Sequence, residues 1–304
     1  MKILLFSDFH ISGRNPRSRI DNYYQSCLQK FEEILFLSKD CDYIISAGDL
    51  LDSPVVANTI VDDLLDRIDK NKKDFFVIFG NHELQNYNLE ASKATSLAHM
   101  IRRSKYVKHL NELEDKNCYI KGYDCFFENE YKLKEEGLFH NSKKENTIAI
   151  LHQFVTIKSF IQSVAHVVAK DIMNNYSLIV NSHYHIQFDE IINKCRFLNL
   201  GSIGRTAINE QHSPQVAIID TDTLKIEKIQ LKSAKKIEEI FDLEKYHELK
   251  DSEKSIEDFI ASLNSATWQA NDLNSQIEII GKEQKVEKTV IKYIQDKIKE
   301  INNV

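Results

Sequence analysis

Five short apolar runs in the first two thirds of this chain end on side chains that bind divalent metals. The runs are KILLFS, CDYIISAG, DFFVIFG, NTIAIL and SLIVNS, and the side chains that follow them are Asp8, His10, Asp49, Asn81, His82, His152, His183 and His185. Short runs rich in Ile, Val, Leu and Phe, bounded by polar segments, predict buried strands. Because open α/β sheets build their sites at the carboxyl ends of strands, we predict a metal site assembled from several strand ends.

The first two motifs have spacings that suit metal binding. Asp8 and His10 lie two residues apart, so in an extended segment both side chains point to the same side. Gly48 allows a tight turn before Asp49, whose two carboxylate oxygens can bridge two cations. Asp52, three residues later, is expected to cap or hydrogen-bond the following helix rather than bind a metal.

The histidines of the remaining motifs are candidate metal ligands, with one exception. The amide oxygen of Asn81 is a competent ligand for hard metals, and the adjacent His82 cannot easily reach the same ion. We therefore expect His82 to act on the substrate. A single histidine on an apolar strand is usually a core residue, but the histidines at the last two strand ends are better explained as ligands. These are His152, His183 and His185.

Two aspartates, one asparagine and four histidines are too many ligands for one ion. They fit two ions that share a bridging carboxylate, about 3.5–4 Å apart as in other two-metal sites. The ligands are oxygen and nitrogen atoms with no thiolate, which favours Mn²⁺ or Fe²⁺ and allows Zn²⁺. We therefore expect two Mn²⁺ ions, with Fe²⁺ or Zn²⁺ as alternatives.

The pattern along the chain predicts the elements that position these residues. Strands and helices alternate up to about residue 110, which predicts a parallel sheet, and Ser53-Pro54 is expected to open one of the helices. We expect a helix after His152, with an apolar face that includes Val164, Val167 and Ile172, and then antiparallel strands that close a second sheet. The core is expected to span 1–231, a charged linker 232–250, and a small α/β unit 251–304 with a strand at SQIEIIG and a helix over 285–301.

Composition narrows the class of protein. No apolar run approaches the ~18 residues of a membrane helix, and the first residues contain no signal-peptide pattern, so we expect a cytoplasmic protein without membrane contact. The five cysteines are scattered and are expected to be reduced thiols. The net charge of −6 argues against a large basic surface for nucleic acid. Arg14, Arg17 and Arg19 nevertheless form a local basic cluster, and Arg14 and Arg17 are candidate substrate-binding residues.

The motifs DxH, GDLLD, GNH, H and HxH, in this order over residues 1–220, resemble those of the calcineurin-like metallophosphoesterases. The GDLLD motif, the segment RFLNLGSIGRTAINEQHSPQVAIID and the terminal α/β unit are most similar to the nuclease subunit of the SbcCD complex and its relatives. The resemblance implies a two-sheet α/β/β/α sandwich followed by a small α/β cap domain. It also implies one ion held by Asp8, His10, Asp49 and His185, and a second held by Asp49, Asn81, His152 and His183.

The same resemblance implies an activity and partners. His82 would protonate the leaving oxygen in a Mn²⁺-dependent DNA exonuclease or endonuclease that acts in double-strand-break processing or recombination. The implied partners are DNA, an SbcC-like ATPase and a second copy of the chain in a homodimer. The chain departs from the pattern at Glu83, where Asp is frequent, and the helices that dock on the ATPase are not evident. Two alternatives stay open, namely a phosphoesterase for nucleotides or phosphoproteins and a non-catalytic scaffold with structural ions.

Overall fold

The computed structural model describes residues 1–16, 19–86, 88, 90–125, 129–159, 165–244, 277, 286 and 288–302. The chain divides into two units, Met1–Phe241 and Asp242–Val304. In the second unit the predicted terminal helix is present as α8 (Lys288–Asn302). The predicted strand SQIEIIG lies outside the described residues, apart from Ile277, which is helical and so contradicts the prediction at that position. No helix within the described ranges is long and apolar enough to cross a bilayer.

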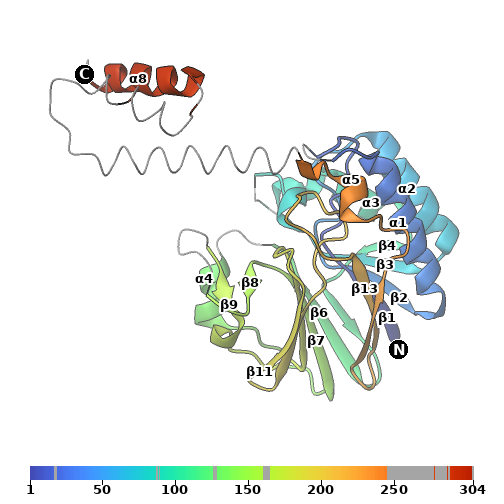
Figure 1. The fold of residues 1–304 in the computed structure, drawn as a ribbon. Helices are drawn as coiled ribbons and strands as arrows, with labels where there is room; N and C mark the ends of the chain where they lie inside the picture. The colour runs from blue at the N-terminus through green and yellow to red at the C-terminus, as the bar shows by residue number, and fades with distance from the viewer. Residues whose placement is uncertain are drawn as a thin grey trace. The chain divides into compact units, whose positions relative to one another are not determined.

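The first unit contains two six-stranded sheets that pack face to face (Figure 1). The first sheet has the order β14-β13-β1-β2-β3-β4. Its strands are β1 (Lys2–Phe6), β2 (Tyr43–Ser46), β3 (Asp74–Val77), β4 (Val107–His109), β13 (Gln215–Asp220) and β14 (Lys225–Gln230). β1 to β4 run parallel, as the alternation of strands and helices predicts, and β13 pairs antiparallel with β1.

The second sheet has the order β11-β12-β10-β7-β6-β5. Its strands are β5 (Glu112–Glu114), β6 (Cys118–Tyr123), β7 (Asn146–His152), β10 (Leu178–Ser182), β11 (Phe188–Ile192) and β12 (Cys195–Asn199). The four central strands β6, β7, β10 and β12 are parallel, and the two outer strands are antiparallel to their neighbours. The central strands therefore end on the same edge of the sheet.

Helices cover the outer face of the first sheet (Figure 1). They are α1 (Tyr23–Leu37), α2 (Asn58–Asn71) and α3 (Ser96–Arg103), with the short helices η1 (Ser38–Asp40), η2 (Asn81–Glu83) and η3 (Ala91–Ala94) between strands. The outer face of the second sheet is covered by α4 (Asn129–Glu136), η4 (Ala169–Asp171) and a small sheet of β8 (Val155–Thr156) and β9 (Val167–Val168). The expected two-sheet α/β/β/α sandwich is confirmed.

Three local predictions were wrong. Pro54 does not open a helix, because its carbonyl accepts the N–H of Ser96 and α2 begins only at Asn58. The segment after His152 forms β8, β9 and η4 instead of a helix, although residues 160–164 lie outside the described part. The last two strands, β13 and β14, extend the first sheet next to β1 rather than the second.

The first unit continues past Leu231, where we expected the core to end, through α5 (Ile237–Ile240). Ile240 and Phe241 are buried, and the backbone carbonyl of Ile240 accepts the N–H of Ile20 at 3.0 Å. The guanidinium of Arg19 lies 5.4 Å from the centre of the Phe241 ring. Through these contacts the segment after Leu231 packs against the rest of the first unit and forms a hydrogen bond with it.

Candidate metal centre

The two sheets bring the predicted strand ends together. β1, β2 and β3 are parallel neighbours in one sheet, and β7 and β10 are parallel neighbours in the other. The ends of these strands and the loops that follow them carry seven candidate ligands: Asp8, His10, Asp49, Asn81, His152, His183 and His185. Donor atoms from six of these residues form two groups, in each of which all the atoms lie within 4.8 Å of one another.

Four of these residues have a left-handed backbone. Their φ angles are 50° for Asp8, 54° for His10, 49° for Asp49 and 76° for His183. Residues other than glycine rarely adopt this region, and each such residue costs on the order of 1 kcal/mol that the surroundings must offset. The segment from Asp8 to His10 is therefore not extended. Our assumption of an extended segment was wrong. Its geometry is fixed instead by the carbonyl of Asp49, which accepts the N–H groups of both Phe9 and His10.

The first group consists of Asp8, His10 and His185. The Nε2 atoms of the two histidines face each other at 3.1 Å, and Oδ1 of Asp8 lies 3.7 Å from Nε2 of His185. The other carboxylate oxygen of Asp8, Oδ2, is buried and has no hydrogen-bond partner within the described residues. A buried carboxylate oxygen without a partner is costly, and a cation between these atoms would satisfy it.

The second group consists of Asp49, His152 and His183. Nε2 of His152 lies 3.2 Å from Oδ2 of Asp49 and 3.0 Å from Oδ1 of Asn81. Oδ2 of Asp49 also lies 3.7 Å from Nε2 of His10, so this carboxylate lies between the two groups. Burial, followed by the nearby His152, lowers the pKa of His183 to about 3, which keeps the imidazole neutral and able to bind a metal. The donor set fits two divalent cations.

Hydrogen bonds outside the two groups orient the imidazoles. Nδ1 of His152 donates to the carbonyl of Ala47 at 3.0 Å, which directs Nε2 towards Asp49. Gly48 is required here, because a Cβ atom at this position would collide with Nδ1 of His152, and its φ is +91°. Such outer contacts fix the tautomer and the direction of a metal-binding histidine.

Glu83 holds the two loops that carry Asp49 and Asn81. Its carboxylate accepts the backbone N–H groups of Asp49, Leu51 and Gly80 at 2.8–3.1 Å. Burial and the charge of Asp49 raise the pKa of Glu83 to about 8, while the N–H donors oppose this shift. Gly80 leaves room for the arrangement, since a Cβ atom there would collide with Oδ1 of Asp49. The Glu in place of the more frequent Asp therefore still joins both loops.

His82 and Asp52 form a third group together with His10. Nδ1 of His82 donates to the carbonyl of Asp52 at 3.0 Å and lies 3.4 Å from its carboxylate, which is also 3.4 Å from Nδ1 of His10. The interaction with the Asp52 carboxylate raises the pKa of His82 to about 9 despite partial burial. Asp52 therefore does not cap α2, whose N-cap is Ala57, and the expectation that it would do so was wrong.

Comparison with known proteins shows the family of this chain. The family model of the calcineurin-like phosphoesterase superfamily domain matches residues 1–224. The chain belongs to this superfamily. No curated protein sequence matches the chain.

Several solved structures are similar to this phosphoesterase. A Thermus thermophilus protein has 12% identity and a TM-score of 0.48, over 76% of this chain and 99% of its own. A dimetal phosphatase from Danio rerio has 10% identity and a TM-score of 0.47, over 76% and 99% of the two chains. An archaeal phosphodiesterase has 14% identity and a TM-score of 0.39, over 76% and 100%.

Sequence reasoning also missed a second neighbour of the phosphoesterase centre. Oε1 of Glu210 accepts a hydrogen bond of 2.9 Å from Nδ1 of His185. Burial opposes the charge of Glu210, but this hydrogen bond outweighs it and lowers the pKa of the carboxyl to about 2. The only signal in the sequence was the position of Glu210 in the segment GSIGRTAINE, which follows the HxH motif.

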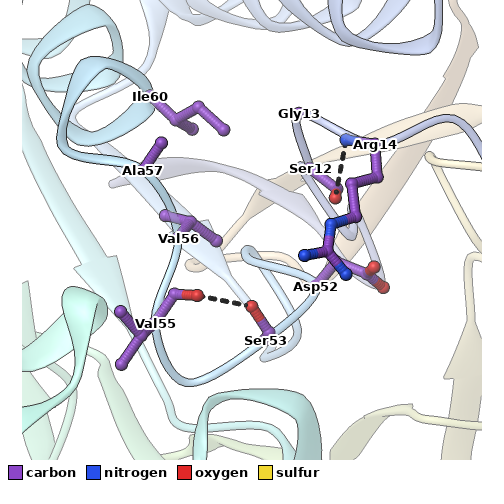
Figure 2. Close-up of a pocket in the computed structure, with 9 residues that line it drawn as sticks. All are labelled: Ser12, Gly13, Arg14, Asp52, Ser53, Val55, Val56, Ala57 and Ile60. Atoms are coloured by element: carbon purple, nitrogen blue, oxygen red, sulfur yellow. Dashed lines mark hydrogen bonds between the residues drawn. The ribbon is translucent and has the colours of Figure 1, made fainter.

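Of the two candidate substrate-binding arginines, the structure describes only Arg14. Arg14 lines a pocket beside Asp52, with a volume of about 530 Å³ (Figure 2). Arg17 lies outside the described residues. The third residue of the cluster, Arg19, is buried and structural, since its guanidinium donates to both carboxylate oxygens of Asp21 and to the carbonyls of Gly204 and Arg205. The five cysteines are all free and buried, as predicted.

Proposed function

We propose that this chain is a two-metal phosphodiesterase that cleaves DNA with two Mn²⁺ ions, as an exonuclease or endonuclease in double-strand-break processing or recombination. The observation that carries the proposal is the position of Asp49 between two groups of ligands, with His82 beside them. One ion would be held by Asp8, His10, Asp49 and His185. The other would be held by Asp49, Asn81, His152 and His183.

Bound metals of this kind polarise a phosphate and activate a water for attack on phosphorus. The protein side chains then have to orient the ester and supply a proton. Nδ1 of His82 is engaged by Asp52, so Nε2 is left to face the substrate. With that nitrogen protonated, its proton would pass to the leaving oxygen as the P–O bond breaks.

The choice of DNA as substrate rests on the resemblance of the motifs to those of the SbcCD nuclease subunit and on Arg14. The Arg14 guanidinium makes no hydrogen bond or ion pair with any described residue, so it is available to a nucleic-acid ligand. An SbcC-like ATPase and a second copy of the chain are proposed as partners on the same resemblance. Mn²⁺ is proposed because the ligands combine carboxylate, amide and imidazole groups.

A second candidate function keeps the chemistry and changes the substrate to a nucleotide or a phosphoprotein. It is favoured by the net charge of −6, which does not provide a broad basic surface for a polynucleotide. The metal centre itself would contact only the phosphate of a substrate, so it does not distinguish DNA from a nucleotide or a phosphoprotein.

The test is to incubate the pure full chain with Mn²⁺ and, separately, linear duplex DNA, circular single-stranded DNA and a mononucleotide phosphodiester. A parallel set of reactions contains EDTA. We expect cleavage of at least one DNA substrate with Mn²⁺ and none with EDTA. Hydrolysis of the mononucleotide ester alone would favour the second candidate. No hydrolysis of any substrate would contradict the first candidate and the nucleotide form of the second, and would favour a non-catalytic scaffold.

A further inference from the structure

A pocket opens next to the metal centre, between the segment that follows the DxH motif and the start of α2. Its volume is about 530 Å³, within the range of roughly 300–1,000 Å³ typical of small-molecule sites. It is lined by Ser12, Gly13, Arg14, Asp52, Ser53, Val55, Val56, Ala57 and Ile60. Figure 2 shows Arg14 on one side of the opening and Val56, Ala57 and Ile60 on the other.

Asp52 connects this pocket to the site of bond cleavage. Its carboxylate lies 3.4 Å from Nδ1 of His82, and the same residue lines the pocket. His82 is the group that would protonate the leaving oxygen. The pocket therefore lies within reach of a substrate whose phosphate is on the metal centre.

The apolar wall of the pocket includes a side chain that the core does not use. Val55 is 69% exposed, whereas Ile60 is only 4% exposed and forms the inner part of the wall. Together with Val56 and Ala57, these two residues make one side of the pocket apolar. Val55 is also fixed in place, since its carbonyl accepts the Ser53 hydroxyl at 2.8 Å (Figure 2).

The polar side of the pocket limits the chemistry of the occupant. The Ser12 hydroxyl accepts the backbone N–H of Arg14, and the Arg14 guanidinium makes no hydrogen bond or ion pair with any described residue. A guanidinium plane stacks well on an aromatic ring and also donates hydrogen bonds to its edge. The carboxylate of Asp52 would repel a second phosphate in the same space. The pocket thus suits a neutral group with a flat apolar face and polar edges.

We infer that this pocket binds the nucleobase of the leaving nucleoside, between the Arg14 guanidinium and the wall formed by Val55, Val56 and Ala57. This inference rests on the proposed phosphodiesterase activity and narrows its substrate to nucleotide esters. A base held in this way must be unstacked from its neighbour, so a chain end or a single strand enters more easily than an internal base pair.

The inference is tested with the dinucleotide d(TpT) and two analogues in which one thymine at a time is replaced by hydrogen. Chromatography of the products identifies which nucleoside leaves. Loss of the base on the leaving nucleoside should lower kcat/KM about tenfold or more, in line with the energy of stacking one base. Loss of the other base should have a much smaller effect. Equal kcat/KM for all three dinucleotides would overturn the inference and leave the phosphodiesterase activity in place.

Variants of the pocket provide the second half of the test. Ala57→Trp fills the pocket and Arg14→Ala removes the stacking partner, so both should reduce the preference for the complete leaving nucleoside. Asn58→Trp adds the same ring at a residue that does not line the pocket, and Arg103→Ala removes an exposed arginine of α3, so both should keep the preference. An unchanged preference in Ala57→Trp would also overturn the inference.

A binding measurement separates the inference from the proposed activity. The probe is a dinucleotide with 2-aminopurine on the nucleoside that would leave, added to the full chain without metal so that it is not consumed. Quenching of its fluorescence should be lost in Ala57→Trp and kept in Asn58→Trp. If none of the dinucleotides is hydrolysed but this pattern holds, the proposed function fails and the nucleobase pocket stands. If the two variants quench equally, the pocket is rejected.

Discussion

Nδ1 of His185 donates a hydrogen bond of 2.9 Å to Oε1 of Glu210, which joins the last histidine of the metal centre to the segment between β12 and β13. The same carboxylate accepts the backbone N–H and the hydroxyl of Thr206. Glu210 is thus held from both sides, and it fixes the ring of His185 with Nε2 towards Asp8. We regard it as a positioning residue for the metal centre.

Glu210→Gln should weaken Mn²⁺ binding about 10–100-fold, the usual cost of losing a partner of a metal-binding histidine. The amide is similar in size, so the fold should be retained, but it cannot stabilise the His185 imidazole as a carboxylate does. Isothermal titration with Mn²⁺ measures the change. The matched control is Glu238→Gln, an exposed residue of α5. Equal affinity in Glu210→Gln and the control would exclude this role.

His82→Ala should retain both metal ions and lose about 10²–10⁴-fold in phosphodiester cleavage, the typical contribution of a general acid. The ions should be retained because His82 is not one of the seven candidate ligands. It lies beside the two ligand groups, and Asp52 orients its ring. Metal content by elemental analysis and kcat on a DNA substrate provide the two measurements. His99→Ala, at an exposed residue of α3, is the control. Normal cleavage by His82→Ala would show that another group protonates the leaving oxygen.

Asp49→Ala should lose both ions, because its carboxylate lies within 3.7 Å of histidines from both groups. The loss should appear as Mn²⁺ content near zero after dialysis, and as the absence of cleavage. Asp40→Ala, at an exposed aspartate of η1, should bind metal like the wild type. Two equivalents of Mn²⁺ retained by Asp49→Ala would remove Asp49 as the shared ligand.

The strand ends of the metal centre could be predicted because each follows a short, almost fully apolar run. The position of Asn81 and His152 after such runs is a local property of the sequence, and parallel strands bring distant ends to one edge. The left-handed backbone at Asp8 and His10 could not be predicted in this way. It depends on the carbonyl of Asp49, which is distant in sequence and accepts both N–H groups of the turn.

Contacts that depend on loops were the ones that sequence reasoning missed. Asp52 resembles a helix cap, but α2 begins several residues later and leaves its carboxylate beside His82. Glu210 reaches His185 only because the segment after β12 folds back over the sheet edge. The helix expected after His152 was wrong because β8 pairs with β9, a tertiary contact that the local spacing of apolar residues does not contain.

Lys30 gives a prediction for stability against pH. Its ammonium is buried and donates to the carbonyls of Ile203 and Gly204, and burial lowers its pKa from 10.5 to about 8. Between pH 8 and pH 10.5, Lys30 is mostly protonated in the unfolded chain and mostly deprotonated in the folded protein. The contribution of Lys30 to the free energy of unfolding should therefore rise as the pH increases from 8 to 10.5, by about 3 kcal/mol in total.

The measurement is the free energy of unfolding from urea titrations at about pH 7.5, 8.5, 9.5 and 10.5 for the wild type and Lys30→Met. Removal of the ammonium leaves the two carbonyls with fewer donors, so the variant is expected to be less stable at every pH. The informative quantity is the difference between the two proteins, which should widen as the pH rises because only the wild type gains from deprotonation of Lys30. Lys39→Met, at an exposed lysine of η1, should show a constant difference from the wild type. A constant difference for Lys30→Met as well would mean that Lys30 keeps an ordinary pKa in the folded protein.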